Sequence, residues 1–364
     1  MQNRAVDAKY EPKKGSYTPI GLAQARALTL NDLDVAMLRS LSQNKPVQSY
    51  LRKPAKLMAK ELGVDEATVR SRLKKWQNSG FLVYMGATVN QALIGQRRCL
   101  VRFEVSDMSR KNEVTDRLRL VEGIYRVRDY DGAAFTVSIF FDTPAVLDKR
   151  IELIRALVHT QGSFRVELNG LPKPHTELDE TDLLILGAMA WSARKPHVSV
   201  ARETGLSAKT VRKRLERMQE NQTIGMGLFL DYRRLTGVLL ADLLVAHIQG
   251  EKEEINRRIQ TTLGERMLPQ SFSTAGVSGF RLILTNVSEQ RKILDAVSRL
   301  NGVKHVWFDI LVEDFFIVET FYAMERQVLA RVAAKRPLRP ITYKAWEESW
   351  KLSTTDIYPR TELP

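Results

Sequence analysis

The feature that most constrains this sequence is a motif that occurs twice. The first copy, from Met58 to Trp76, reads as a short helix, a turn at Gly63 and a second helix. Asp65 opens that second helix, and its side-chain oxygen can accept the free backbone N–H groups of the first helical turn. The second copy, from Val200 to Leu215, has Ser207 in place of Asp65 and keeps the run Thr-Val-Arg-x-Arg-Leu. So tight a connection is typical of a helix-turn-helix unit, whose second helix can enter a DNA major groove.

Each copy precedes a similar series of strands and helices. The first series comprises strand Cys99 to Val105, helix Lys111 to Val121, strands Ile124 to Tyr130 and Phe135 to Phe141, helix Ala145 to Val158, and strand Phe164 to Leu168. The second comprises strand Leu239 to Ile248, helix Lys252 to Leu263, strands Ser271 to Ala275 and Phe280 to Thr285, helix Glu289 to Leu300, and strand Val303 to Val312. This βαββαβ order predicts a ferredoxin-like sheet with both helices on one face. The other face then needs a cover, by pairing of the two copies or by dimerisation of the chain.

The fold class that follows is α+β, with two winged helix-turn-helix domains, each followed by a ferredoxin-like domain. The copies are 142 residues apart, far too long for a solenoid repeat, so a whole two-part protein is duplicated. The expected segments are a flexible basic arm (1–28), the first winged helix (29–90), the first sheet domain (91–169), a linker (170–177), the second winged helix (178–232), the second sheet domain (233–328) and a C-terminal extension (329–364). Trp346 and Trp350 indicate that the extension packs on the rest of the chain.

Basic charge is concentrated in the two helix-turn-helix segments. The chain carries 56 Lys and Arg against 42 Asp and Glu, a formal charge of +14. Nine basic and three acidic residues lie between Lys45 and Lys75, and eight basic and three acidic between Arg194 and Glu220. Most of the net charge therefore lies where a nucleic acid would bind, and a polyanionic partner is indicated.

Helical periodicity selects the side chains that would face DNA. With Val69 and Val211 directed inward, the outward positions are Ala67, Arg70, Ser71, Lys74 and Asn78 in the first copy, and Lys209, Arg212, Lys213 and Arg217 in the second. Because arginine can pair bidentately with guanine, Arg70 and Arg212 are the candidate base readers. Lys74 and Lys75 are expected to meet phosphates.

Arg72 and Arg214 flank the buried face of their helices. We expect them to contact the DNA backbone, or else to pair with Glu61 and Glu203. The alternative is that these basic faces are simply solvated and bind nothing. Their coincidence with two helix-turn-helix motifs argues against that alternative. The outward faces of the two helices differ, so one chain is expected to read an asymmetric site.

The sequence resembles the Lrp/AsnC family of feast/famine transcriptional regulators. The similarity rests on Leu-Asp-x-x-Asp at Leu178 to Asp182, on the two helix-turn-helix motifs described above, on Gly80-Phe81-Leu82, and on the βαββαβ order. It implies a DNA-binding winged helix followed by an oligomerising sheet (RAM-like) domain that often binds an amino acid. The family's acidic middle turn is displaced here, which argues against amino-acid binding, most of all in the second half. The candidate effector residues are Asp129, Asp131 and Gly132.

Two other functions use the same fold and stay open. Siroheme decarboxylases resemble this family and place histidine and arginine around a tetrapyrrole, whereas an architectural DNA-binding protein would use the same basic faces with little sequence preference. The five histidines have no metal-ligand spacing, so we expect no enzyme activity, no cofactor and no metal. Cys99 is the single cysteine, and no apolar window spans a membrane, so a cytoplasmic protein is expected.

Overall fold

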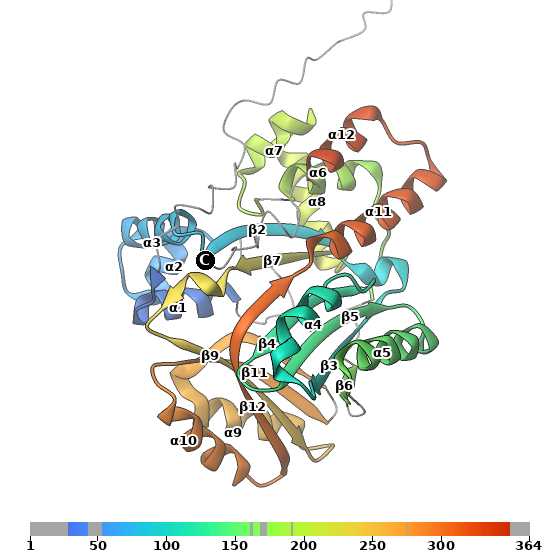
Figure 1. Ribbon diagram of the computed structural model, residues 1–364. Coiled ribbons are helices and arrows are strands. Elements are labelled where there is room, and N and C mark those ends of the chain that lie inside the picture. Colours follow the sequence, from blue (N-terminus) through green and yellow to red (C-terminus); the bar gives the residue numbers. More distant parts are fainter. Residues whose placement is uncertain are drawn as a thin grey trace, which may run out of the picture.

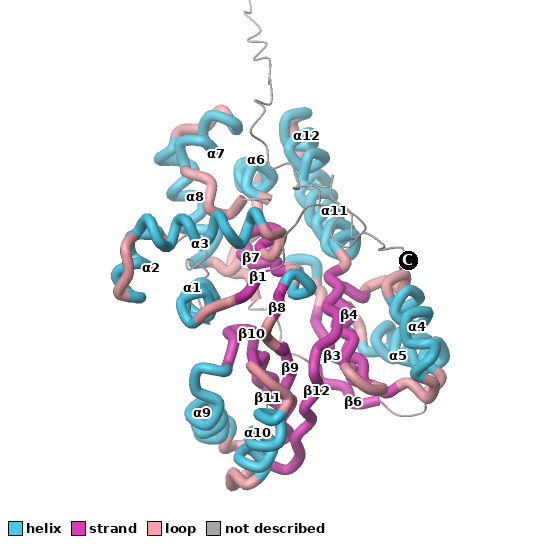
Figure 2. The backbone as a smooth tube through the Cα atoms, turned by 60° about the vertical axis from the view of Figure 1, so that its left-hand side comes forward, coloured by secondary structure: helices cyan, strands magenta, loops and turns pink. Residues whose placement is uncertain are grey.

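The computed structural model describes residues 28–42, 53–160, 163–167, 173–190, 192–274 and 276–349. Residues 1–27 of the expected arm, residues 170–172 of the expected linker, and residues 350–364 of the C-terminal extension, Trp350 among them, lie outside these ranges. Figures 1 and 2 show sheets in the middle and lower part of the molecule, with helical domains above them. Within the described ranges, none of the helices has the length and apolar character that a bilayer crossing requires.

Each half contains a three-helix domain, a connecting strand and a sheet domain. The first helix domain consists of α1 (Asp32–Ser42), α2 (Ala55–Leu62) and α3 (Glu66–Asn78), and the second of α6 (Glu180–Met189), α7 (His197–Thr204) and α8 (Ala208–Glu220). The connecting strands are β2 (Leu82–Val89) and β7 (Ile224–Leu230). The short 3-10 helix η3 (Gln91–Ile94) follows β2, and η5 (Tyr232–Arg234) and the strand β8 (Leu235–Thr236) follow β7. β2 and β7 pair antiparallel, so the two halves are joined at this level.

The two sheet domains have the expected βαββαβ order. The first contains β3 (Arg97–Glu104), η4 (Met108–Arg110), α4 (Lys111–Leu118), β4 (Ile124–Tyr130), β5 (Ala134–Phe141), α5 (Pro144–Val158) and β6 (Ser163–Glu167). The second contains β9 (Leu239–His247), α9 (Lys252–Leu263), η6 (Gly264–Arg266), β10 (Met267–Ser273), β11 (Val277–Leu284), α10 (Ser288–Ser298) and β12 (Val303–Phe316). The predicted fold class is confirmed.

A single eight-stranded sheet links the two halves, with the order β10-β11-β9-β12-β4-β5-β3-β6. The link is β12, which pairs with β9 along its first part and with β4 from Leu311 to Phe316. β12 is therefore longer than the predicted Val303 to Val312, because its last residues find a partner strand in the other half. The two copies thus cover each other within one chain.

Alternation along the strands separates an apolar face from a polar one. In β5, the side chains of Phe135, Val137 and Ile139 lie in the hydrophobic core shared with α4 and α5. Thr136 and Ser138 fall on the opposite face and are also buried. Since the second half covers that opposite face, both faces of the strand are excluded from water.

The first helix domain packs against the second half of the chain. Its hydrophobic core includes Leu240 of β9 and Leu268 of β10. Arg39 of α1 donates from Nε to the Met267 carbonyl at 3.1 Å, and β1 (Leu28–Thr29) pairs parallel with β8. The first helix domain therefore packs on the sheet domain of the second half, although the first sheet domain follows it in sequence.

The C-terminal extension forms two helices that support the second helix domain. α11 (Val318–Lys335) continues directly from β12, and α12 (Pro340–Ser349) crosses α6. Trp346 is buried in the core of the second helix domain, and its Nε1 donates to the Leu183 carbonyl at 2.9 Å. At the crossing a Cβ on Gly187 would lie 3.1 Å from that of Ala345, so glycine permits the close approach.

Candidate nucleic-acid interface

The two candidate recognition helices, α3 and α8, have the same length of 13 residues and the same position in their domains. Each follows a glycine in the left-handed conformation, Gly63 with φ 66° and Gly205 with φ 70°. Their inward side chains, Val69 and Val211, are fully buried. The outward positions predicted from the periodicity are exposed, namely Ala67, Arg70, Ser71, Lys74, Asn78, Lys209, Arg212 and Lys213, and the candidate phosphate-binding residue Lys75 is exposed as well.

Arg70 and Arg212, the candidate base readers, are the most exposed arginines of these helices, at 69% and 57%. Each has a glutamate on its own helix. Arg70 donates to Glu66 at 2.8 Å from Nε, and Arg212 lies 3.8 Å from Glu216. Exposed i,i+4 ion pairs stabilise by only about 0.3–0.5 kcal/mol, so both guanidinium groups can leave their glutamates at small cost.

Asp34 fastens the first recognition helix to α1. Its carboxylate is completely buried and accepts from Trp76 Nε1 at 2.9 Å and from Arg72 Nη1 at 3.2 Å. It also accepts from the Asn31 backbone N–H, while the Asn31 side chain accepts from the Asp34 backbone N–H. One carboxylate therefore caps α1 and fixes the orientation of α3.

Asp182 has the same position in the second helix domain but different partners. It forms a capping box with Asp179, and its carboxylate accepts from Arg214 Nη1 at 3.3 Å and from Arg217 Nη2 at 2.5 Å. Arg214 also donates to Asp179. Arg217, selected as an outward residue, is half-buried and directs its guanidinium to α6.

The predicted pairs of Arg72 with Glu61 and of Arg214 with Glu203 are wrong. Both arginines form intramolecular ion pairs, but with the aspartates of the first helix in each domain. Glu61 pairs with Lys53 and Glu203 with Lys195 instead. The reason is geometric, because the acidic N-terminus of the first helix lies beside the middle of the recognition helix.

The N-termini of the two recognition helices differ in their caps. The Ser207 hydroxyl accepts from the Thr210 backbone N–H at 3.0 Å, as expected. Asp65 also occupies the N-cap position, but its side chain makes no capping hydrogen bond, so that expectation is wrong. In the first copy the side chain contributes only its negative charge at the positive end of the helix.

This difference predicts unequal effects of cap removal. Ser207→Ala is expected to destabilise α8 by about 1 kcal/mol, because one backbone N–H loses its acceptor. Asp65→Ala is expected to cost only about 0.3 kcal/mol in α3, the low end for an exposed charge at a helix terminus. Hydrogen exchange of the α8 and α3 amides measures both. Equal acceleration in the two variants would contradict the difference in capping.

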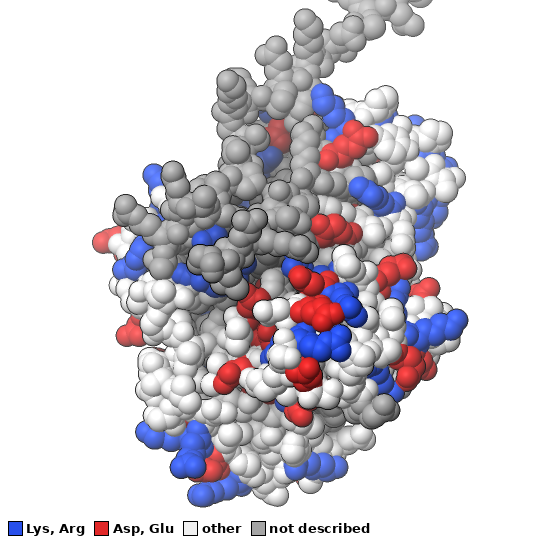
Figure 3. Space-filling model, viewed as in Figure 1, with Lys and Arg blue, Asp and Glu red and all other residues white. Residues whose placement is uncertain are grey.

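Exposed basic side chains lie on the first helix domain. In the space-filling view, Lys and Arg side chains lie at the upper left, where α2 and α3 are found (Figure 3). On α4 of the first sheet domain, acidic and basic side chains are interspersed instead, with Glu113 pairing with both Arg110 and Arg117. Interspersed charges cancel at short range, so α4 contributes little to the long-range field.

The candidate effector residues lie where β4 turns into β5. Asp129 is buried, and its carboxylate accepts from Lys111 Nζ at 2.5 Å. Burial raises the pKa of Asp129, against the effect of Lys111. Asp131 is exposed and donates its backbone N–H to the Ile310 carbonyl, and Gly132 adopts φ 77°. An effector at this turn would have to compete with Lys111 for Asp129, and effector binding stays a prediction.

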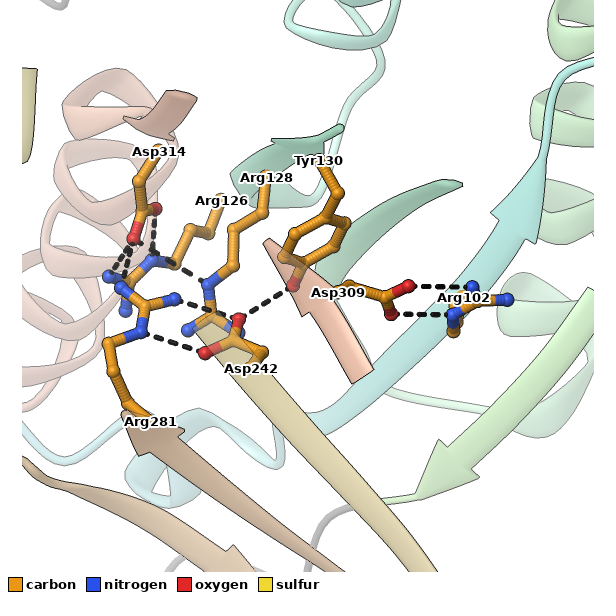
Figure 4. Close-up of polar contacts among 8 residues, drawn as sticks. All are labelled: Arg102, Arg126, Arg128, Tyr130, Asp242, Arg281, Asp309 and Asp314. Carbon is orange, nitrogen blue, oxygen red and sulfur yellow. Dashed lines mark hydrogen bonds and ion pairs between the residues drawn. The ribbon is translucent and has the colours of Figure 1, made fainter. Parts of the chain in front are cut away.

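The sequence interpretation missed a network of buried charges between the two sheets (Figure 4). We call it the inter-sheet ion network, and it comprises Arg102, Arg126, Arg128, Tyr130, Asp242, Arg281, Asp309 and Asp314. At its centre, Arg281 donates to both oxygens of Asp242 and to Asp314, each at 2.8 Å. The Tyr130 hydroxyl donates to Asp242 at 2.6 Å, and Arg102 donates two hydrogen bonds of 2.8 Å to Asp309.

The pKa values of the network aspartates show how strongly the arginines act on them. Burial alone would raise the pKa of Asp242, but Arg281 and Arg128 outweigh it and hold the pKa at about 2. Burial is likewise outweighed at Asp314, whose pKa Arg126 and Arg281 hold far below its usual value. A single charge within an apolar strand, such as Asp242 between Ala241 and Leu243, is the signal that indicates such a site. Among the described residues no His, Cys, Asp and Glu cluster has a metal-binding arrangement.

Comparison with known proteins identifies several relatives. Residues 178–219 match the AsnC-type helix-turn-helix domain. The HTH-type transcriptional regulator LysM of Sulfurisphaera tokodaii is 29% identical over 133 residues, which cover 35% of this chain and 89% of that protein. Among solved structures, the siroheme decarboxylase NirDL aligns with 83% of this chain and 99% of its own, at 15% identity and a TM-score of 0.49. AsnC of E. coli aligns with 38% of this chain and 94% of its own, at 14% identity and a TM-score of 0.28.

Proposed function

Since this chain belongs to the Lrp/AsnC family of helix-turn-helix proteins, we propose that it is a sequence-specific, DNA-binding transcriptional regulator. The observation that carries the proposal is the pair of exposed basic faces on α3 and α8, each held in place by a buried aspartate on the first helix of the same domain. A rigidly mounted helix with exposed arginine at its centre fits direct reading of a major groove. The regulator LysM has the same kind of helix-turn-helix, which supports the proposal.

The two recognition helices read different half-sites. Ala67, Ser71 and Lys74 of α3 correspond in position to Lys209, Lys213 and Glu216 of α8. Arg70 and Arg212 are common to both and are assigned to guanine. The neighbouring positions differ in charge and size, and these differences set the second and third bases of each half-site. One chain therefore recognises an asymmetric operator of double-stranded DNA.

The test is selection of bound duplexes from random DNA with the wild type, Arg70→Ala and Arg212→Ala. The wild type is expected to enrich a site with two unlike halves. Each variant is expected to lose its preference at one half only, with about 1–3 kcal/mol less discrimination at the base it reads. Arg257→Ala is the matched control, since Arg257 is 69% exposed, as Arg70 is, but lies on α9 at the far end of the molecule (Figure 1).

Two outcomes contradict this proposal. Unchanged site selection by both arginine variants would remove α3 and α8 from base reading, and weak enrichment of all sequences would favour an architectural protein. We further propose that the chain is not an enzyme, because its histidines lie in separate elements. His247, for example, is committed to Ser278 and to the Ile248 carbonyl. Purified protein with tetrapyrrole absorbance and no affinity for duplex DNA would favour a decarboxylase instead.

A further inference from the structure

The two helix domains share one two-stranded ribbon, formed by β2 and β7. β2 begins in the hydrophobic core of the first helix domain and ends in that of the second, whereas β7 begins in the second core and ends in the first (Figure 1). The ribbon residues at the first core are Leu82, Met85, Leu228 and Leu230, and those at the second are Ala87, Val89 and Ile224. The position of α3 relative to α8 therefore depends on this ribbon.

The middle of the ribbon is its most deformable point. Gly86 of β2 and Gly227 of β7 lie opposite each other there, between the residues that belong to the two cores. A glycine pair provides no cross-strand side-chain contact and weakens the strands that contain it. A two-stranded ribbon without further support is also only marginally stable in water. The ribbon by itself would therefore let the two helix domains bend relative to each other.

The loop between α6 and α7 supports the ribbon beside this glycine pair. Ala193 in the loop is completely buried in the core of the first helix domain, which also contains Met58 and Trp76. Its backbone N–H donates at 2.6 Å to the carbonyl of Met85, the residue before Gly86. A loop of the second helix domain is therefore a structural part of the first.

The residues on either side of Ala193 also contact the first half. Ser192 forms a β-bridge with Met85. Arg194 donates from Nη2 to the Lys53 carbonyl at 2.9 Å, next to the start of α2. Three consecutive residues of the second helix domain are thus attached to the first at separate points, which restrains rotation as well as translation.

We propose that residues 192–194 fix the separation and the orientation of α3 and α8, so that the chain binds its two half-sites at one spacing only. The inference rests on the proposed function and adds the spacing of the half-sites to what the protein recognises. Ala193 is a positioning residue in this proposal, because it is buried and acts through the two recognition helices.

The spacing requirement follows from the geometry of DNA. Each base pair inserted between the half-sites moves the second half-site by about 3.4 Å along the axis and turns it by about 35°. A fixed pair of helices cannot follow both changes, so one helix loses its groove. A pair released at Gly86 and Gly227 could follow them by bending the ribbon.

The experiment measures binding of the full chain to duplexes in which one to five base pairs are inserted between the half-sites selected by the wild type. The wild type is expected to lose about tenfold or more in affinity with two inserted base pairs, because one arginine–guanine contact is lost. Ala193→Asp places a charge that cannot stay unpaired in the core, so the loop leaves it. This variant is expected to bind the native spacing more weakly, and to lose less than about threefold over the same insertion, because both helices still reach their bases.

Ala145→Asp is the matched control. Ala145 is exposed in the first turn of α5, on the first sheet domain and away from the ribbon (Figure 1). This variant should keep the spacing profile of the wild type. Hydrogen exchange of α3 and α8 shows whether both recognition helices are folded in each variant. If Ala193→Asp unfolds α3, Arg194→Met becomes the deciding variant, since it removes the bond to the Lys53 carbonyl without adding a charge to the core, and it should widen the spacing profile.

A measurement without DNA tests the restraint directly. Spin labels on Ser71→Cys and Lys213→Cys report the distance between α3 and α8, while Cys99 is buried. We expect a narrow distance distribution with Ala193 in place and a broad one in Ala193→Asp.

A wild-type spacing profile in the deciding variant would overturn the inference and leave the proposed function standing. A broad distance distribution with Ala193 in place would overturn it as well. A wild-type protein without preference for any half-site would overturn the proposed function instead, and the distance measurement would still decide whether residues 192–194 hold the two helices.

Discussion

Replacing Arg281 by methionine is expected to lower the free energy of unfolding by about 3–5 kcal/mol at neutral pH. The substitution keeps an unbranched apolar side chain of similar length but removes the three hydrogen bonds to Asp242 and Asp314. Both carboxylates then remain buried with too few partners, which is the costly consequence of breaking a buried ion pair. Urea unfolding, with hydrogen exchange of β9 and β11, measures the effect.

The pH dependence identifies the cause of this loss. The pKa of Asp242 is about 2 in the folded protein, below the unfolded value of about 3.9. Its stabilising contribution is therefore complete above about pH 4 and is lost as the pH falls toward 2. In Arg281→Met the Asp242 carboxylate lacks its main partner and takes up a proton at higher pH, so the deficit relative to wild type should shrink in acid. A deficit that stayed constant down to pH 2 would point to packing instead.

Two further substitutions serve as controls for Arg281→Met. Arg281→Lys retains a positive charge but cannot donate two parallel hydrogen bonds to one carboxylate. Its free energy of unfolding should therefore lie between those of the wild type and Arg281→Met. Arg257→Met removes an arginine that is 69% exposed and pairs with Glu254 on the surface. Its effect is expected to stay below about 1 kcal/mol.

Asp34→Ala is expected to disable the first helix domain and leave the second intact. The substitution removes the acceptor of Trp76 Nε1, of Arg72 and of the Asn31 backbone N–H, and the indole and guanidinium lie in or beside the core. We expect a loss of about 3–5 kcal/mol from this domain. Site selection should then retain only the half-site read by α8.

Asp32 provides the matched control for Asp34. It lies two residues earlier in the first turn of α1 and is exposed. Asp32→Ala should therefore cost about 0.3–1 kcal/mol through the helix dipole and leave site selection unchanged. Hydrogen exchange of α3 distinguishes the two variants. Wild-type protection of α3 in Asp34→Ala would show that the carboxylate does not fasten the recognition helix.

Local sequence patterns were sufficient for most elements of this fold. The helix predicted from Lys252 to Leu263 is α9 with the same bounds, and the strand predicted from Ile124 to Tyr130 is β4. Such elements follow from hydrophobic periodicity and from glycines that end helices and strands, and both are local properties of the sequence. The exposed positions of α3 and α8 followed from the same argument, since a helix with one buried stripe fixes the direction of every other side chain.

The remaining features depend on contacts between residues distant in sequence. Arg72 pairs with Asp34, 38 positions away, whereas the sequence analysis offered a DNA-backbone contact or the nearer Glu61. The continuation of β12 to Phe316 requires β4 of the other half as a partner. The sequence analysis assigned no role to Arg281, because its partners Asp242 and Asp314 lie on other strands and are not visible in a local pattern.

The strand β12 joins the two halves of one polypeptide in a single sheet, where a symmetric dimer would join two identical subunits. In a symmetric dimer, one codon change alters both subunits and therefore both DNA contacts at once. In this chain each position exists once, so Lys74 and its counterpart Glu216 carry opposite charges without conflict. Under the proposed function, selection can change one half of the operator while the other half stays constant, because each helix domain can diverge one mutation at a time.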